Sequence, residues 1–438
     1  MDPQAINLNE TIQKLNKSVL ELLSERGKNI FFPKLGILSQ SAQAKGKNIN
    51  ATIGEAIEDD GLSMHLSEFD KLIKLPLGSV YPYAPSFGKK ELRDCWKEFI
   101  YKKNPSLGTN VISTPIVTCG LTHGISMSGY LFVDEGDTVV IPDLFWENYS
   151  LIFENAYRGK VVTFPLFKNG SFNIDGFNET LESIDGKIVL LLNFPNNPTG
   201  YTPLVPEINL IVNAIQKQAD HGKSVVAIID DAYFGLVYEK NVYTESIFTQ
   251  LCNLSEKVLA VKLDGPTKED YVWGFRVGFM SFGVKNGTPE LYEALENKTA
   301  GAVRGNISNA SQLSQSLLYQ AYFSEAYAAD KKEKFATLQS RYQTVQQVLA
   351  DPKYLEYFTA LPFNSGYFMC VELNDQLKAE AIRKILLDKY STGVIVFGNL
   401  IRLAFSAVPQ SKIQELIGNI YLACKDYTEQ KSILYRLT

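Results

Sequence analysis

The sequence predicts an α/β fold with a mostly parallel sheet that is covered by helices on both faces. Between about residues 82 and 324, apolar stretches typical of buried strands alternate with segments of helical periodicity. The stretches at residues 187–193, 224–230 and 258–263 carry apolar residues on both faces, as parallel strands do. After about residue 338, helical stretches surround two short strands at residues 366–373 and 394–397, which predicts a smaller α+β domain.

Three segments follow from these patterns. Residues 1–77 are expected to form an N-terminal arm and part of the small domain, residues 78–325 the large domain, and residues 326–438 the rest of the small domain. Apolar residues at helical spacing from 6 to 23 predict a helix in the arm. One long helix from about residue 308 to 340 is expected to connect the two domains.

Composition excludes several classes of protein. Of the 438 residues, 45% are hydrophobic and 21% are charged, which is ordinary for a globular domain. A net charge of −5 with interspersed signs gives no reason to expect nucleic acid or an anionic membrane as a partner. No apolar run approaches about 18 residues, and the first residues do not resemble a signal peptide. Five cysteines and three histidines without ligand spacing predict no metal site and favour the cytoplasm.

Lys268 has the most informative surroundings in the chain. It follows the apolar stretch 258–263 and an Asp-Gly-Pro-Thr turn, and Arg276 comes eight residues later. Such a turn can present a lysine at the mouth of a sheet, with a guanidinium close by to hold an anionic group. A partly desolvated lysine beside another cation has a lowered pKa and can form a Schiff base near neutral pH. Taken alone, such a lysine is more often a solvated residue of a surface loop.

Two further strands end in polar residues upstream of this turn. The stretch 187–193 leads into an Asn-Asn-Pro-Thr-Gly turn that contains Asn197, and the stretch 224–230 leads into Asp-Asp-Ala-Tyr, ending at Tyr233. Ligands in open α/β sheets bind at the carboxyl ends of strands, where these residues would stand. Alone, Asp230 could be a helix N-cap. Asp231, the next residue, is the competing candidate for a functional carboxylate at this strand end.

In this order, the segments closely resemble the class I/II aminotransferases, which are fold-type I pyridoxal-phosphate enzymes similar to aspartate aminotransferase. The resemblance implies a seven-stranded sheet and a pyridoxal 5'-phosphate cofactor bound by the large domain. It further implies that Asn197 and Tyr233 bind the cofactor's phenolic oxygen, that Asp230 pairs with its pyridinium nitrogen, and that Arg276 binds its phosphate. Lys268 would carry the cofactor. A carboxylate beside the ring nitrogen suits this chemistry, because it keeps the nitrogen protonated.

A phosphate loop is the next point of resemblance. Residues 116–125 have the pattern of a strand, a glycine turn and a helix start, where backbone N–H groups can hold a phosphate. Gly120, Leu121 and Thr122 match the family's loop. The chain departs from the family before the lysine, where many members carry two serines and this chain has Gly265 and Thr267. With this departure, phosphate binding is expected to depend on Thr267, Thr122, Arg276 and backbone N–H groups.

Other segments match the family's pocket wall, its shared subunit contact and its carboxylate site. Trp146 corresponds to the residue that stacks on the cofactor ring, with Phe145 and Tyr149 as neighbours in the wall. Tyr83 matches a tyrosine that reaches the neighbouring subunit's phosphate, which implies a homodimer with shared active sites. Arg402, inside an apolar run, would grip the substrate carboxylate with its planar fork. Its partner could instead be a structural Asp or Glu.

The segment 304–309 resembles the family only in part. Arg304 matches an arginine that reaches into the partner's active site, but Ile307 replaces the usual tyrosine. We therefore expect Arg304 either to bind the side-chain carboxylate of a substrate or to form a salt bridge between subunits.

The resemblance as a whole implies a pyridoxal-phosphate-dependent aminotransferase that moves the amino group of an L-amino acid to a 2-oxo acid, with 2-oxoglutarate as the expected acceptor and ping-pong kinetics. A lyase or decarboxylase on the same fold is the alternative, because the fold does not decide which bond at Cα breaks. A cofactor-binding regulator is less favoured, since only some 30 residues precede Phe31.

Overall fold

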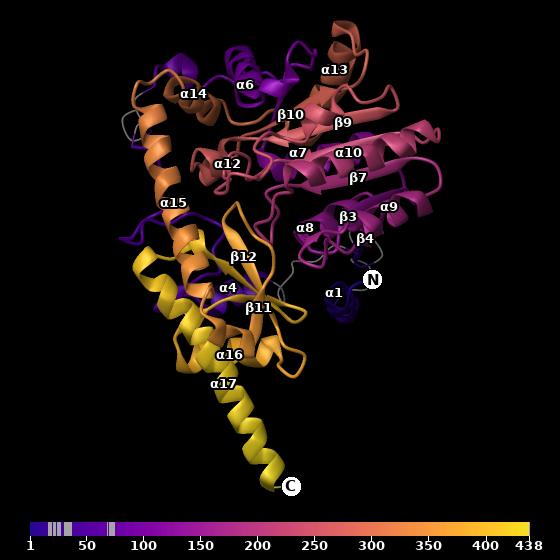
Figure 1. Cartoon of the computed structure of the whole chain (residues 1–438). Coiled ribbons are helices and arrows are strands. Elements are labelled where there is room, and N and C mark those ends of the chain that lie inside the picture. Colours follow the sequence, from indigo (N-terminus) through magenta and orange to yellow (C-terminus); the bar gives the residue numbers. More distant parts are fainter. Residues whose placement is uncertain are drawn as a thin grey trace.

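The computed structural model describes residues 1–15, 37–67 and 75–437, together with Leu20, Leu23, Lys28, Asn29 and Phe69. Figure 1 shows two parts, an upper one built on a large sheet and a lower one built on a small sheet. The helix α15 (Tyr327–Leu349) runs from one part to the other, and the last helix, α17 (Ile413–Leu437), projects from the lower part.

The large sheet has seven strands in the order β2-β10-β9-β8-β7-β3-β4. The strand β10 is antiparallel to both of its neighbours, and the other pairs are parallel. The predicted α/β fold with a mostly parallel seven-stranded sheet is therefore confirmed. Its strands are β2 (Ile116–Thr118), β3 (Thr138–Pro142), β4 (Lys160–Phe164), β7 (Ile188–Asn193), β8 (Val225–Asp230), β9 (Val258–Asp264) and β10 (Gly278–Gly283).

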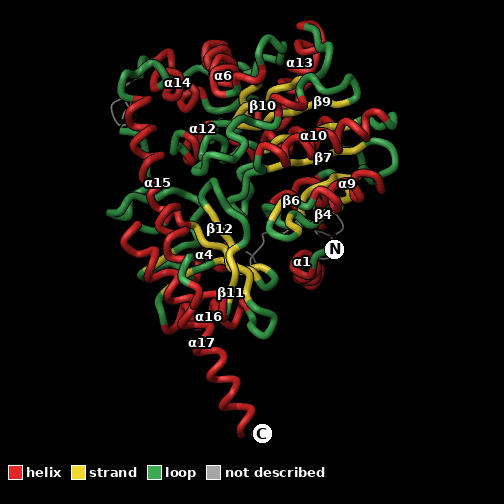
Figure 2. The backbone as a smooth tube through the Cα atoms, viewed as in Figure 1, coloured by secondary structure: helices red, strands yellow, loops and turns green. Residues whose placement is uncertain are grey.

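Helices cover both faces of this sheet, as Figure 2 shows. Val189 and Leu191 of β7 pack into a core with α7 and α13, whereas Leu190 and Leu192 pack into the core that contains α9 and α10. Alternate residues of a strand point to opposite faces, so a continuously apolar strand is what two covered faces require. The helices are α6 (Lys90–Lys103), α7 (Gly120–Phe132), α9 (Ile174–Ser183), α10 (Val205–Asp220) and α13 (Pro289–Ile307).

The lower part holds an antiparallel sheet in the order β11-β12-β15-β14. The N-terminal segment joins it, because β1 (Ile49–Asn50) pairs with β13 (Thr392–Gly393) and the Ala404 N–H donates to the Ala51 carbonyl. Its other elements are α4 (Ile37–Gln43), β11 (Phe358–Ala360), β12 (Phe368–Leu373), α16 (Ala379–Lys389), β14 (Ile395–Phe397) and β15 (Leu400–Ala404). The exact domain limits stay a prediction.

The prediction of one long helix over residues 308–340 is wrong. Two helices occupy this region, α14 (Gln312–Ala321) and α15, with a turn at residues 322–326 between them. Ser324 Oγ accepts from the Ala326 N–H in this turn, a local bond that competes with helix continuation. The break also brings the hydroxyls of Tyr322 and Tyr327 onto one acceptor, Asp270, at 3.1 and 2.7 Å.

The predicted arm helix is present as α1 (Pro3–Leu15), and most of residues 16–23 lie outside the described residues, as does Phe31. The remaining elements are short. They are η1 (Leu77–Ser79), η2 (Pro105–Leu107), α8 (Asn148–Ser150), η3 (Leu151–Ala156), β5 (Phe167–Lys168), β6 (Ser171–Phe172), α11 (Phe248–Leu251), α12 (Pro266–Glu269), η4 (Trp273–Phe275), η5 (Pro352–Glu356), η6 (Phe405–Ala407) and η7 (Gln410–Lys412).

Candidate active site

A cavity of about 530 Å³ lies at the carboxyl ends of β7, β8 and β9, within the size range of small-molecule sites. Both sheets contribute to its wall, because Phe368 of β12 and Arg402 of β15 line it together with residues of the large sheet. Ten of the residues predicted from the sequence line this cavity. They are Leu121, Thr122, Trp146, Asn197, Asp230, Tyr233, Thr267, Lys268, Arg276 and Arg402.

Lys268 enters the cavity from the short helix α12, which follows β9. Its amine lies 5.0 Å from the centre of the Tyr233 ring. Burial lowers the pKa of Lys268 to about 8, with Asp230 opposing this shift and Arg276 adding to it. An amine with this pKa is partly unprotonated at neutral pH and can act as a nucleophile or a base.

The glycine before α12 explains one departure from the family pattern. A Cβ at Gly265 would lie 3.0 Å from the Val277 carbonyl oxygen and 3.1 Å from Leu121 Cδ1. A serine at this position would therefore push against the backbone of the neighbouring strand. The Thr267 hydroxyl lies close by and donates to the same Val277 carbonyl at 3.5 Å, a long hydrogen bond.

Asp230 is the last residue of β8 and is buried at the floor of the cavity. Its Oδ2 accepts from the Tyr149 hydroxyl at 2.5 Å, and its Oδ1 accepts from the Ala232 N–H at 3.1 Å. Burial raises the pKa of Asp230, while the Tyr149 hydrogen bond and the charge of Lys268 act in the other direction. A carboxyl group in this state gains stability as an anion when a further cation approaches it.

The next residue, Asp231, points away from the cavity. It forms a buried ion pair with Lys262, and its Oδ2 accepts from the Ser246 hydroxyl at 2.6 Å. Burial raises the pKa of Asp231 to about 6, against the opposing effect of Lys262. Asp231 is thus paired within the protein, whereas Asp230 faces the cavity.

Arg402 reaches the cavity from the small sheet. One guanidinium nitrogen donates to Asn197 Oδ1 and the other to the Thr52 carbonyl, both at 3.2 Å, and the guanidinium lies 4.4 Å from the Phe368 ring centre. Its Nε is buried without a hydrogen-bond partner. Among the described residues no Asp or Glu forms an ion pair with Arg402, so none of them is the structural partner that the sequence left open. Burial lowers the pKa of this guanidinium.

Another group of residues at the cavity, around Gly120 and Arg276, can bind an anion. Gly120 begins α7 with φ of +73°, and a Cβ there would lie 2.6 Å from a guanidinium nitrogen of Arg276. Arg276 itself has φ of +53°, a left-handed conformation that is uncommon for residues other than glycine. The helix start, the guanidinium and the hydroxyls of Thr122 and Thr267 together can hold a phosphate group.

Three predicted residues do not line the cavity. Gly120 lies directly beside it, against Arg276. Tyr83 is 89% exposed, and Arg304 is exposed on α13. The roles of Tyr83 and Arg304 in a partner's active site therefore stay predictions.

Sequence reasoning missed several residues of the site. Tyr149 lines the cavity as expected, but its hydrogen bond to Asp230 was not predicted. Asn193 ends β7, donates to the Asp230 carbonyl at 2.8 Å, and accepts from the Asn197 N–H at 2.8 Å. No local signal pointed to the N-terminal residues that line the cavity, which are Ile37, Ser41 and Thr52 to Glu55.

Two further sequence expectations concern metals and membranes. In the described part of the chain no group of His, Cys, Asp and Glu side chains could hold a metal ion. Within the same residues, no helix is long and apolar enough to cross a bilayer.

Comparison with known proteins gives a consistent result. A family model described as aminotransferase class I and II matches residues 71–420. A probable aspartate aminotransferase of Methanocaldococcus jannaschii is 30% identical over 235 residues, which are 53% of this chain and 56% of that protein. An aspartate aminotransferase of a Bacillus species is 22% identical over 384 residues, 87% of this chain and 90% of its own length. The chain spans about half the length of the first of these relatives.

Solved structures are similar over nearly their whole length. An aminotransferase from Anaerococcus prevotii superposes with a TM-score of 0.82 at 25% identity and covers 92% of this chain and 99% of its own. The cytoplasmic aspartate aminotransferase of Saccharomyces cerevisiae shares the fold, with a TM-score of 0.75 at 18% identity over 94% of this chain and 100% of its own. Because the family model matches most of the sequence and the fold agrees, this chain belongs to the class I and II aminotransferases.

Proposed function

We propose that the protein is a pyridoxal-phosphate-dependent aminotransferase that moves the amino group of an L-amino acid to a 2-oxo acid. The observation that carries this proposal is the placement of Lys268 in one cavity with Asp230 and with two guanidiniums, Arg276 near the anion site and Arg402 on the side of the small sheet. Relatives named as aspartate aminotransferases support the same activity.

The residues present fit pyridoxal phosphate. Gly120 has no side chain, so the Arg276 guanidinium can lie directly against the start of α7, and this cation together with the helix N–H groups would bind a phosphate. Asp230 is a buried carboxyl group without a salt bridge among the described residues, which suits a pyridinium nitrogen. Asn197 and Tyr233 line the cavity near Lys268 and would hold the phenolic oxygen, and Trp146 would cover a face of the ring.

When bound, pyridoxal phosphate supplies an electron sink for the electrons that remain at the substrate Cα after its proton leaves. Lys268 Nζ would accept that proton and return one later, a task for which a pKa near neutrality is suited.

Arg402 would position the substrate. Its guanidinium can bind the α-carboxylate with two parallel hydrogen bonds, and its free Nε gives a further donor. The Asn197 amide and the Thr52 carbonyl hold the guanidinium in place. A fixed carboxylate orients the Cα–H bond toward Lys268, and such orientation is a large part of catalysis.

The proposal extends to the assembly and the substrates. Arg276 and Arg402 are the two guanidiniums among the described residues of the cavity wall, so a second carboxylate-binding group has to come from elsewhere. In a homodimer with shared active sites, Arg304 of the partner subunit would be that group, and Tyr83 would reach the partner's phosphate. We further propose 2-oxoglutarate as the acceptor, ping-pong kinetics and a cytoplasmic location.

An absorption titration tests the proposed activity. The purified protein, loaded with pyridoxal phosphate, is mixed with single amino acids in the absence of any 2-oxo acid. With an aminotransferase, the visible absorbance of the bound cofactor should fall, and one molecule of 2-oxo acid should be released per site. Addition of 2-oxoglutarate should then restore the starting spectrum. Release of carbon dioxide or ammonia instead would support the lyase or decarboxylase alternative and contradict transamination.

A further inference from the structure

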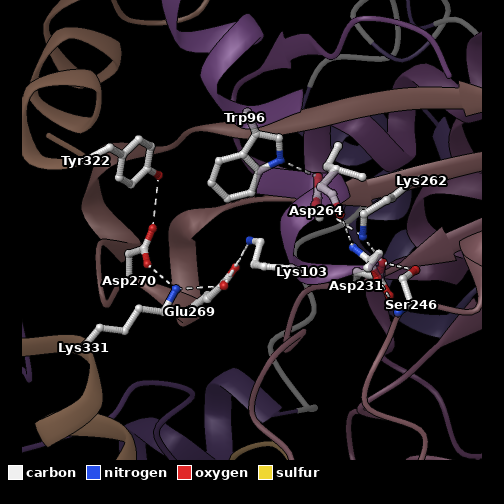
Figure 3. A network of polar contacts seen from close by, with 12 residues as sticks. Trp96, Lys103, Asp231, Ser246, Lys262, Asp264, Glu269, Asp270, Tyr322 and Lys331 are labelled. Carbon is white, nitrogen blue, oxygen red and sulfur yellow. Dashed lines mark hydrogen bonds and ion pairs between the residues drawn. The ribbon is translucent and has the colours of Figure 1, made fainter. Parts of the chain in front are cut away.

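The two residues after Lys268 carry buried charges that the proposed chemistry does not use. Glu269 and Asp270 have side chains that are only 7% and 1% exposed. Lys103 Nζ donates to both oxygens of Glu269 at 3.0 Å. Lys331 Nζ donates to Glu269 at 2.8 Å and to Asp270 at 2.9 Å, so one lysine joins both carboxylates, as Figure 3 shows.

These contacts connect the lysine turn to distant helices. Lys103 is the last residue of α6, and Lys331 lies in the first turns of α15. Asp270 also accepts from the hydroxyls of Tyr322 and Tyr327, which flank the break between α14 and α15. Asp270 thus accepts from three donors of one segment, Tyr322, Tyr327 and Lys331.

A second set of contacts holds the other side of the same turn. The Trp96 indole N–H of α6 donates to Asp264 Oδ1 at 3.0 Å, at the end of β9. Lys103 Nζ lies 4.5 Å from the Trp96 ring centre and links the two sets. The Tyr367 hydroxyl donates to the backbone carbonyl of Lys268 at 2.9 Å. The turn is therefore held from α6, from α15 and from the segment before β12.

Glu269 carries a negative charge in this network. Burial alone would raise the pKa of Glu269, but Lys103 and Lys331 outweigh it and lower the pKa to about 2. Buried ion pairs are weak evidence for stability, because apolar residues of the same shape often stabilise as well or better. The hydrogen bonds in these pairs do fix the orientation of the Glu269 and Asp270 side chains. This matters because α12 has only four residues, and so short a helix is not stable by itself.

We propose that Glu269 and Asp270 are positioning residues for Lys268. Their bonds with Lys103 and Lys331 fix the backbone of the turn, so that the lysine side chain stays inside the cavity. This inference rests on the proposed function only in taking Lys268 as the working amine. The restraint of the turn by these bonds does not depend on cofactor, so it applies to the cofactor-free protein as well.

Three variants separate positioning from general stability. Lys331→Met leaves Asp270 as a buried carboxylate without a cation, and Asp270→Asn combined with Lys331→Met removes both charges. Glu296→Gln is the matched control, because it breaks another ion pair of α6, the partly buried Arg93–Glu296, whose residues do not line the cavity.

The primary measurement is the pH profile of Lys268 labelling in the cofactor-free protein, with an amine-directed reagent and peptide mass mapping. The groups that face this amine are Asp230, Tyr233 and Arg276, and they are unchanged in all variants. Wild type and Glu296→Gln should show a midpoint near pH 8. Both variants at Lys331 should shift the midpoint upward, toward an ordinary lysine near pH 10.4, because the amine leaves its enclosed position.

Stability and turnover give the second comparison. Lys331→Met should lower the melting temperature, and the neutral double variant should recover most of that loss because no lone charge remains buried. In the positioning account the double variant still loses about tenfold or more in kcat, with KM for the amino acid changed less than about threefold. Labelling profiles identical to wild type, or recovery of kcat together with stability, would overturn the proposal. Since labelling needs no turnover, failure of the proposed activity would leave this result interpretable.

Discussion

Tyr149 donates a hydrogen bond of 2.5 Å to Asp230 at the floor of the cavity. The two residues come from different elements, α8 and the end of β8, and both are buried. The bond favours the ionised form of a carboxyl group whose pKa burial raises. Tyr149 therefore assists Asp230 in the proposed chemistry, beyond its packing in the wall.

The variant Tyr149→Phe tests this relationship with a minimal change of shape. Loss of a hydrogen bond to a charged group, worth about 1.5 kcal/mol, should lower the rate of the half-reaction with an amino acid about tenfold. Cofactor retention should change less, because the proposed phosphate contacts remain. Rapid-mixing absorbance measures the first quantity and equilibrium dialysis the second. An unchanged half-reaction rate would show that Tyr149 does not assist Asp230.

Asp230 and Asp231 are adjacent, but their replacement should have different effects, on activity for Asp230 and on stability for Asp231. Asp230→Ala should fold normally and lose most of the rate of Cα deprotonation, because the ring nitrogen loses its counter-charge. Asp231→Ala should cost about 3–5 kcal/mol of unfolding free energy, because Lys262 loses one of its two buried partners. Urea unfolding and the half-reaction rate distinguish the two. A stable, inactive Asp231→Ala beside an active Asp230→Ala would show that the roles are reversed.

Replacement of Arg402 should lower activity only on substrates that carry an α-carboxylate. Arg402→Ala should lower kcat/KM for an amino acid by roughly 10- to 100-fold, from the loss of about 1.5–3 kcal/mol of charge-assisted hydrogen bonding. Arg402→Lys should recover only part of this, since a point charge lacks the planar fork. A primary amine without a carboxylate is the control substrate, and its slower reaction should be nearly unaffected. Equal losses of kcat/KM on both substrates would indicate that Arg402 stabilises the structure and does not bind the substrate carboxylate.

Arg304 tests the shared active site. If it reaches the partner's cavity, Arg304→Ala should reduce kcat/KM for aspartate by one order of magnitude or more and leave an uncharged amino acid unchanged, since a charge-assisted bond is worth roughly 1.5–3 kcal/mol. Lys298→Ala, which removes another exposed cation of α13, is the matched control. Equal changes on both substrates would favour the alternative of a salt bridge between subunits.

The strand ends of this protein could be predicted because the residues that mark each of them are adjacent in the sequence. An apolar stretch that stops at Asn193 or Asp230 marks both a buried strand and the point where it meets the cavity. The family resemblance then places Lys268 and Arg402 on the same site, and both line the cavity.

Partners across the fold could not be predicted in the same way. Arg402 contacts the Thr52 carbonyl 350 residues away, and Tyr149 contacts Asp230 across 81 residues. Nothing in the sequence near Glu269 and Asp270 points to their partner Lys331, which lies 62 and 61 residues later. The break between α14 and α15 was missed for the same reason, since helical periodicity continues through it and long-range bonds to Asp270 accompany the break.

The central claim is that Lys268 is the amine on which the proposed activity depends. Reduction of the pyridoxal-phosphate-loaded protein with borohydride, followed by peptide mass mapping, tests it most directly. The account predicts one reduced cofactor per chain, attached to Lys268, and a Lys268→Ala variant that binds cofactor without covalent attachment and loses several orders of magnitude in turnover. Attachment to another lysine, or an active Lys268→Ala variant, would contradict it.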